Sequence, residues 1–196
     1  SYIHNISVGT LFKVHNAGVA TGNDNLLVSY DKADLCDKRL TEADIPFVKY
    51  NYRPFDTRFS IYDSKLIQRL RTNTMNHAMV PGNISLLVTK INRQISTLYV
   101  GLVEGVTDRH YLDSAGDSMH VFPLYLHNKS TSSAPNFNIS ELNLLTQHLQ
   151  KAPTPEAILD YIYATFHSPS YREKYKEFLK IDFPRIPIPT QAEFDR

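Results

Sequence analysis

The sequence contains a single cysteine, Cys36, and no apolar run that approaches the roughly 18 residues of a membrane span. One cysteine excludes an internal disulfide and a cysteine-based zinc site, and it is typical of a reducing compartment. No basic-then-apolar leader opens the chain, so a secretory signal is not expected. We therefore expect a soluble, cytoplasmic protein without a membrane partner.

The common catalytic signatures are missing as well. The sequence has no G-x-S-x-G turn, no P-loop and no dinucleotide-binding glycine pattern, and its eight histidines never have the spacing of metal ligands. Asp56, Asp63 and Lys65 imitate a magnesium nuclease, but Asp63 falls in the turn after a predicted strand, so we reject a nuclease site. No Pro-Pro-Tyr segment is present to hold an extruded adenine. We expect no catalytic residue and no metal site in this chain.

Charge is the first positive feature of this sequence. With 196 residues, of which 42% are hydrophobic and 21% charged, the chain has the composition of a folded domain. Its net charge is only +1, but the window from Lys49 to Arg93 has eight basic and two acidic residues, a net charge of +6 against −5 elsewhere. Such a window indicates a polyanionic partner. The alternatives are a solvated face with scattered lysines and a scaffold whose basic window meets an acidic protein surface.

The order of predicted elements indicates an α+β fold. Strands are predicted over 11–14, 26–30, 47–52, 58–62, 84–91, 97–103 and 120–126. Helices are predicted from Asp31 to about Leu40, over 64–79, and after Thr154 and Ser168, where a proline follows each cap. The proline-rich stretch 183–189 is expected to lie extended on the surface. The chain then divides into a strand-rich part with a few inserted helices (1–128), a polar linker (129–138) and a helical part (139–196), or it forms one compact domain.

Three stretches carry a family resemblance. The first is GVATGND at 18–24, and the second is YRPFDTR at 52–58, which continues to Arg69-Leu70-Arg71. The third is VFPLYL at 121–126, followed by 161–172 and by FLKIDFPRIP at 178–187. In this order they resemble the carboxyl-terminal DNA target-recognition region of type ISP and type IIG restriction–modification enzymes, which are adenine-specific DNA methyltransferases.

The resemblance implies that this chain is a piece of a longer bacterial defence protein. An upstream methyltransferase domain, often joined to nuclease and translocase domains, would perform the chemistry with S-adenosylmethionine, and the strand-rich part of this chain would choose the DNA sequence. The expected partners are therefore double-stranded DNA and the upstream methyltransferase domain of the same polypeptide. The piece itself would hold no cofactor and would not be an enzyme. Past the Pro-Arg-Ile-Pro stretch, relatives would continue into another short helix, which Arg196 would truncate.

Side chains that read bases are expected on turns and helix ends of the basic window. Arginine bonds guanine, and asparagine or glutamine bonds adenine, in the major groove. The candidates are Arg69, Arg71, Asn73, Asn76, His77, Asn83, Lys90, Asn92, Arg93 and Gln94, with residues 92–94 at a predicted hairpin tip first among them.

A second set of residues is expected to contact phosphate or to stabilise the fold. It comprises Lys49, Arg53, Arg58, Lys65, Gly22 and Asn23. Arg53 and Arg58 flank one turn and either clamp phosphate or lock the fold. The loop over 18–24 either approaches phosphate closely or is a tight connection. The aromatic residues between 161 and 175 are expected to pack in the core rather than to stack on bases.

Overall fold

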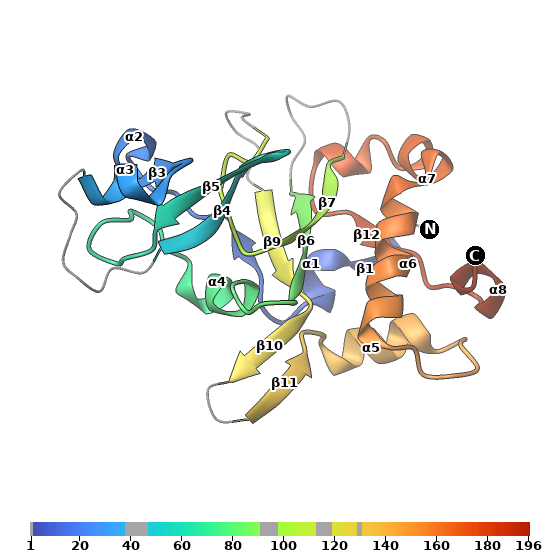
Figure 1. Cartoon of the computed structure of the whole chain (residues 1–196). Helices are drawn as coiled ribbons and strands as arrows, with labels where there is room; N and C mark the ends of the chain where they lie inside the picture. The colour runs from blue at the N-terminus through green and yellow to red at the C-terminus, as the bar shows by residue number, and fades with distance from the viewer. Residues whose placement is uncertain (1, 38–46, 91–97, 113–118, 129–130) are drawn as a thin grey trace.

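The computed structural model of the 196-residue chain describes residues 2–37, 47–90, 98–112, 119–128 and 131–196. These residues form two four-stranded sheets, two shorter strand pairs and several helices (Figure 1). The mixture of helices and largely antiparallel strands confirms the predicted α+β class.

The central sheet has the order β2-β9-β6-β7, and its neighbouring strands are antiparallel. Its strands are β2 (Asn16–Ala17), β9 (Met119–Pro123), β6 (Ile84–Thr89) and β7 (Val100–Glu104). The pairing of β6 with β7 confirms the hairpin predicted between 84 and 103. Its connection lies outside the described residues, and with it Asn92, Arg93 and Gln94, the first candidates for base reading.

The second sheet has the order β3-β5-β4-β8. Its strands are β3 (Val28–Ser29), β5 (Asp56–Ile61), β4 (Phe47–Arg53) and β8 (Val106–Thr107). β4 and β5 form a hairpin whose turn is Pro54-Phe55, and β8 runs parallel to β4. In Figure 1 the turn is the free tip of the teal hairpin, away from α2 and α3.

Strand β6 lies at the centre of the molecule because both of its faces are buried. Successive side chains of a strand point to opposite faces. Leu86 and Val88 accordingly belong to one hydrophobic cluster, which includes Phe166 of helix α6, whereas Leu87 belongs to the other, which includes Tyr50 of the second sheet. The central sheet is therefore sandwiched between the second sheet and the C-terminal helices, as Figure 1 also shows.

The helices are α1 (Val8–Leu11), α2 (Asp24–Leu27), α3 (Lys32–Asp37), α4 (Thr72–Ala78), α5 (Ile139–Thr146), α6 (Pro155–His167), α7 (Pro169–Lys174) and α8 (Gln191–Phe194), with 3-10 turns at Tyr2–His4 and Phe178–Lys180. The predicted starts of α6 and α7 are confirmed. The Thr154 side chain accepts a hydrogen bond from the Ala157 amide, and that of Ser168 accepts one from the Tyr171 amide.

Three local predictions in the first half of the chain are wrong in whole or in part. Residues 11–14 were expected as a strand, but Leu11 ends α1. The range 26–30 is half helix, because the Asn23 side chain caps α2 before β3 begins. Of the helix predicted over 64–79, only α4 (Thr72–Ala78) is helical. Residues 67–71 are held away from helical geometry, since the backbone of Gln68 and Arg69 pairs with Thr21 and Ala20.

The segment with linker composition also has a different structure from the one expected. Within 129–138, the strand β11 (Thr131–Pro135) pairs with β10 (Tyr125–Asn128). The stretch 183–189 is not a surface segment, because β12 (Arg185–Ile186) pairs with β1 (Ile6–Ser7) and Ile186 is buried. One hydrophobic cluster contains residues from before and after the segment, so the core crosses the boundary predicted there.

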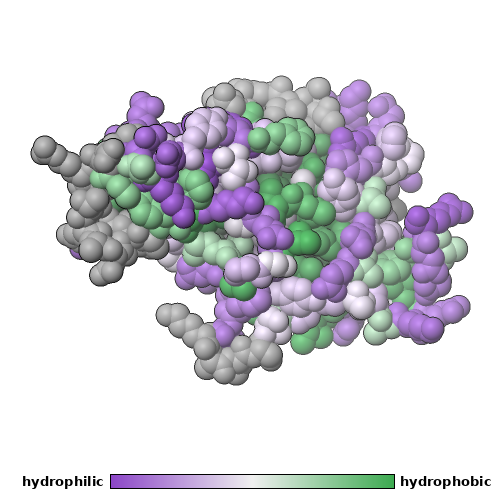
Figure 2. Space-filling view, viewed as in Figure 1, coloured by the Kyte–Doolittle hydropathy of each residue, from purple (hydrophilic) through white to green (hydrophobic). Residues whose placement is uncertain are grey.

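The face of the molecule shown in Figure 2 has both hydrophobic and hydrophilic side chains. Hydrophobic side chains show in the middle of this face, near β6 and β7, and hydrophilic ones dominate over the C-terminal helices. No helix among the described residues is long and apolar enough to span a membrane.

Candidate nucleic-acid interface

The β4–β5 hairpin is braced by a stack of arginine and tyrosine side chains. The guanidinium carbons of Arg53 and Arg58 lie 3.9 Å and 4.0 Å from the centre of the Tyr52 ring. Arg58 also lies 4.5 Å from the ring of Tyr30. Cation–π contacts of this kind hold both the rings and the guanidinium groups in place.

Each of these arginines also has a carboxylate partner. Arg58 pairs with Asp56 at 2.7 Å, and this contact lowers the pKa of the Asp56 carboxyl group. Arg53 pairs with Asp108 at 3.2 Å and donates to the Tyr52 carbonyl at 2.6 Å. Because both guanidinium groups are engaged within the chain, the geometry favours the fold-locking role over the phosphate clamp for Arg53 and Arg58.

Asp108 is the buried centre of this network, with a relative exposure of 3%. Its carboxylate accepts hydrogen bonds from the Tyr50 hydroxyl and the His110 amide, both at 2.6 Å. Burial raises the pKa of Asp108, and burial together with the neighbouring carboxylate raises the pKa of Tyr50 well above its usual value. Tyr50 therefore remains a phenol that donates to Asp108.

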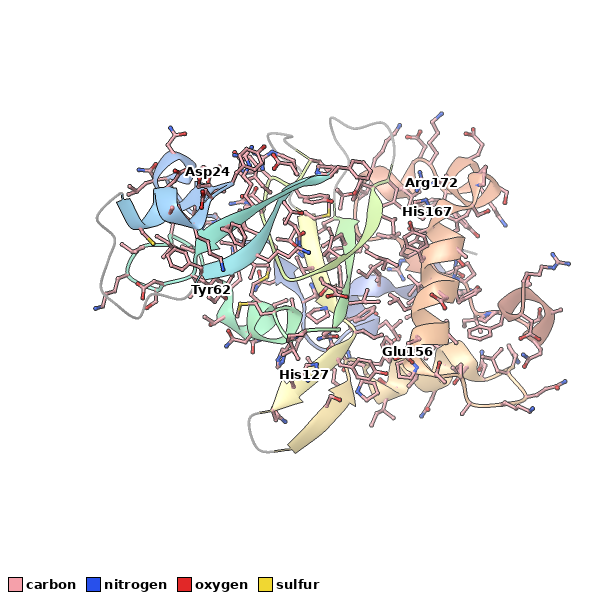
Figure 3. All side chains as sticks on the ribbon, in the orientation of Figure 1. Asp24, Tyr62, His127, Glu156, His167 and Arg172 are labelled. Atoms are coloured by element: carbon pink, nitrogen blue, oxygen red, sulfur yellow. The ribbon has the colours of Figure 1, made fainter. Side chains whose placement is uncertain are left out.

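A polar hollow of about 530 Å³ adjoins this network. Its lining residues are Ala20, Thr21, Gly22, Asn23, Asp24, Asn25, Tyr52, Gln68, Asp108, Arg109 and His110. The Tyr52 hydroxyl donates to Asp24 at 3.0 Å, and Thr21 also donates to Asp24, which Figure 3 labels. The structure thus brings Gly22, Asn23 and Arg69 of the predicted set close to one another, since Arg69 pairs through its backbone with Ala20.

The glycines of the loop over 18–24 serve internal packing. A Cβ atom on Gly18 would lie 2.6 Å from the Asp108 carbonyl group, and one on Gly22, where φ is +83°, would lie 3.1 Å from the Gln68 side chain. Asn23 is used as the cap of α2. These contacts favour the tight connection over the phosphate-binding loop.

Two candidates for base reading are engaged inside the protein. Asn83 is buried, and its side-chain amide donates to the carbonyls of His77 and Tyr125, each at 2.9 Å, so its assignment as a base reader is corrected. The His77 ring accepts a hydrogen bond from the amide of His127, which Figure 3 labels. Exposed side chains remain at Lys49, Lys65, Arg69, Asn73, Asn76 and Lys90.

Charged side chains from separate segments act on the ring of His120 in β9. We call His15, Arg71, Lys90, Arg109 and His120 the His120 cluster. Burial, followed by the charges of the other four members, lowers the pKa of His120 to about 4. The rings of His15 and His120 are 5.8 Å apart, and the Arg109 carbonyl accepts a hydrogen bond from the Met119 amide, next to His120.

Lys90 and Arg71 of the His120 cluster have weak or incomplete pairing within the chain. Lys90 meets the carboxylate of Asp182 only at 3.9 Å, and both side chains are largely exposed. Among the described residues, Arg71 Nε, His15 Nδ1 and His120 Nδ1 are buried atoms without a hydrogen-bond partner. Arg71 also has a left-handed φ of 57°, which costs about 1–3 kcal/mol in a residue other than glycine. An anion bound at this place would compensate the charge.

The His120 cluster joins predicted and unpredicted residues. Arg71 and Lys90 belong to the basic window, whereas Arg109, His15 and His120 lie outside it. No local signal identifies these three residues, because the pairing of β2 with β9 and the close approach of Gly18 to Asp108 bring them together.

Acidification is expected to destabilise the protein through His120. The pKa of His120 is about 4 in the folded chain, against 6.5 normally. As the pH falls, this ring is therefore protonated in the unfolded chain before it is protonated in the folded chain. The resulting stability is present above pH 6.5 and is lost as the pH falls towards 4, by about 2 kcal/mol at pH 4.5. Urea unfolding of the protein and of His120→Gln at pH 7 and at pH 4.5 measures the contribution of His120 to this loss of stability.

The exposed His148 supplies the matched control. His148→Gln should keep the full loss of stability between the two pH values, whereas His120→Gln should lose about 2 kcal/mol less than the unchanged protein. Equal pH dependence of all three proteins would mean that His120 does not titrate as its surroundings indicate.

Comparison with known proteins agrees with this architecture. The family model described as the Type ISP C-terminal specificity domain matches residues 36–195. No curated protein matches the sequence.

Solved structures share the fold at low sequence identity. A DrdV–DNA complex is 21% identical over 94% of this chain, with a TM-score of 0.77. The Type ISP enzyme LlaBIII bound to DNA is 18% identical over 100% of this chain, with a TM-score of 0.78. A nuclease-deletion mutant of the Type ISP enzyme LlaGI, in complex with a DNA substrate mimic, is 15% identical over 99%, with a TM-score of 0.72. The chain spans 22%, 16% and 19% of these proteins, respectively. The chain belongs to the Type ISP C-terminal specificity domain family.

Proposed function

We propose that this chain binds double-stranded DNA and selects the target sequence of a longer restriction–modification protein. The observation that carries the proposal is the His120 cluster, where the cationic side chains of Arg71, Lys90 and Arg109 come from three separate segments and act on a place with buried, unpartnered nitrogen atoms. Phosphate groups are the anions that such clusters bind on DNA. Membership of a specificity-domain family and the DNA-bound structural neighbours support this function.

Phosphate binding and base reading fall to different residues in this proposal. The His120 cluster contacts the backbone and fixes the position of the duplex. Arg71 is the residue before α4, so a duplex held there also lies near the exposed side chains of Asn73 and Asn76 on that helix. These amides have the bidentate geometry that distinguishes adenine from the other bases.

Methyl transfer belongs to an upstream adenine-specific domain in this proposal, with S-adenosylmethionine as the methyl donor. The glycine loop that could cradle it is filled by the backbone of Asp108 at Gly18 and by the side chain of Gln68 at Gly22. The contribution of this chain is to place the DNA.

Selection from a random pool of duplexes tests the function. The 196-residue chain is expected to enrich one short sequence and to bind it at least about 1,000-fold more tightly than a scrambled duplex. Its affinity should fall with salt concentration, with a slope of about 0.9 units of log K for each phosphate contacted. Equal binding of selected and scrambled duplexes would contradict target selection.

The alternative is a scaffold whose basic surface meets an acidic protein. Salt-sensitive binding to an acidic protein, such as a polyglutamate-rich carrier, without measurable binding to any duplex would favour that function. Titration of both partners under the same salt series separates the two.

A further inference from the structure

Phe55 has an unusual conformation at the turn between β4 and β5. Its side chain is fully exposed, and its φ of 63° lies in the left-handed region that bulky residues rarely adopt. An exposed aromatic ring on a strained backbone adds nothing to the stability of the fold, so this conformation indicates a use outside it.

The flanking residues hold the backbone of this turn in place. Pro54, directly before it, has a restricted φ. On the β5 side, Arg58 pairs with Asp56 and packs on Tyr52, and on the β4 side, Arg53 packs on Tyr52 and pairs with Asp108. The backbone that carries the ring therefore does not have to be ordered when a partner binds, which favours tight binding.

The surroundings of Phe55 do not resemble the centre of a protein–protein interface. Such a centre is a patch of several apolar and aromatic residues with few charges. Here the neighbours along the hairpin other than Pro54 are charged or polar, namely Arg53, Asp56 and the exposed Thr57. The ring of Tyr30, which is also exposed, has the Arg58 guanidinium group against it.

We propose that Phe55 is an apolar wedge that enters between two adjacent base pairs of the DNA bound to this chain. Single phenylalanine or proline side chains act in this way in proteins that kink a duplex. Arg53, beside this turn, pairs with Asp108, and the residue after Asp108 is Arg109 of the His120 cluster, so the backbone at 108–109 links the turn to the proposed phosphate site. Because the DNA comes from the proposed function, the wedge depends on it.

A fluorescent base analogue in the duplex tests the insertion. The probe is the duplex selected by the 196-residue chain, with 2-aminopurine placed at one position at a time. Unstacking by the ring should increase the fluorescence at one step. Phe55→Ala should abolish this increase and weaken binding about tenfold, the effect of losing one aromatic stacking contact.

Phe55→Gly separates a wedge from a structural role. Glycine adopts the left-handed φ without strain, so this variant should have an equal or higher melting temperature than the unchanged protein and yet bind DNA as weakly as Phe55→Ala. A loss of melting temperature in Phe55→Gly would overturn the proposal, because the ring would then stabilise the fold.

Phe178→Ala removes a different exposed phenylalanine and is expected to change neither fluorescence nor affinity. If Phe55→Ala retains both signals, the wedge is overturned and a contact with another protein domain takes its place. The wedge is also overturned if Phe55→Ala binds more weakly but the unchanged protein does not increase the 2-aminopurine fluorescence. The ring would then touch DNA without entering the base stack. If the unchanged chain binds no duplex, the proposed function itself fails, and the wedge fails with it.

Discussion

Replacing Arg71 and Lys90 together by glutamine should weaken binding to the selected duplex about 100-fold, if each side chain makes one charge-assisted phosphate contact. Both side chains belong to the His120 cluster, where their positive charges act on the same buried ring. The slope of log K against log salt should fall by about 2 units, since roughly one counterion is released for each phosphate contact. Fluorescence anisotropy over a salt series measures the affinity and the slope.

Lys174→Gln with Lys176→Gln is the matched control for this variant. It removes the same charge from exposed positions at and just beyond the end of α7. We expect an affinity within about threefold of the unchanged protein, because exposed charges remote from the contact act only through a screened field. Equal losses from the two variants would mean that total charge alone matters and that the His120 cluster does not face DNA.

Replacing Asp108 by alanine should lower the free energy of unfolding by about 3–5 kcal/mol. The buried carboxylate accepts hydrogen bonds from Tyr50 and His110 and pairs with Arg53. Its removal leaves a buried hydroxyl and a partly buried guanidinium group without their partner. Urea unfolding followed by circular dichroism measures the change.

The exposed Asp182, paired with Lys90 at 3.9 Å, provides the comparison. Asp182→Ala should change the free energy of unfolding by less than about 1 kcal/mol, because solvent screens such pairs. Tyr50→Phe, which removes one hydrogen bond and leaves the ion pair, should cost about 1 kcal/mol. A cost for Asp108→Ala no larger than that for Asp182→Ala would mean that Asp108 does not hold the hairpin to the loop at 108–110.

The amino-acid sequence predicts several elements of this fold through local rules. Thr154 and Ser168, each followed by a proline, mark the starts of α6 and α7, because the cap and the restricted φ act within one helical turn. The apolar runs around β6 and β7 predict their hairpin. The order of the motifs also indicates the Type ISP family, and the family model confirms it.

Tertiary structure decided the rest, since long-range pairing overrode local preference. Residues 67–71 have a helical pattern, but their backbone pairs with the loop at 20–21, which lies some 47 positions earlier in the chain. Asn83 resembles an exposed base reader in sequence, yet the partners that bury it come from both α4 and β10. Likewise, no spacing in the sequence relates His15, Arg109 and His120.

The sequence by itself therefore determined the fold class, the starts of the later helices and the family, all of which depend on neighbouring residues or on the order of motifs. Only the tertiary structure decided which charges meet, because the strand order β2-β9-β6-β7 brings distant segments together. It also decided that the arginines of the YRPFD turn brace a hairpin, since their partners Tyr30 and Asp108 lie in segments outside that turn. The net charge of a sequence window does not show which face of the protein is basic, because packing decides where each side chain lies.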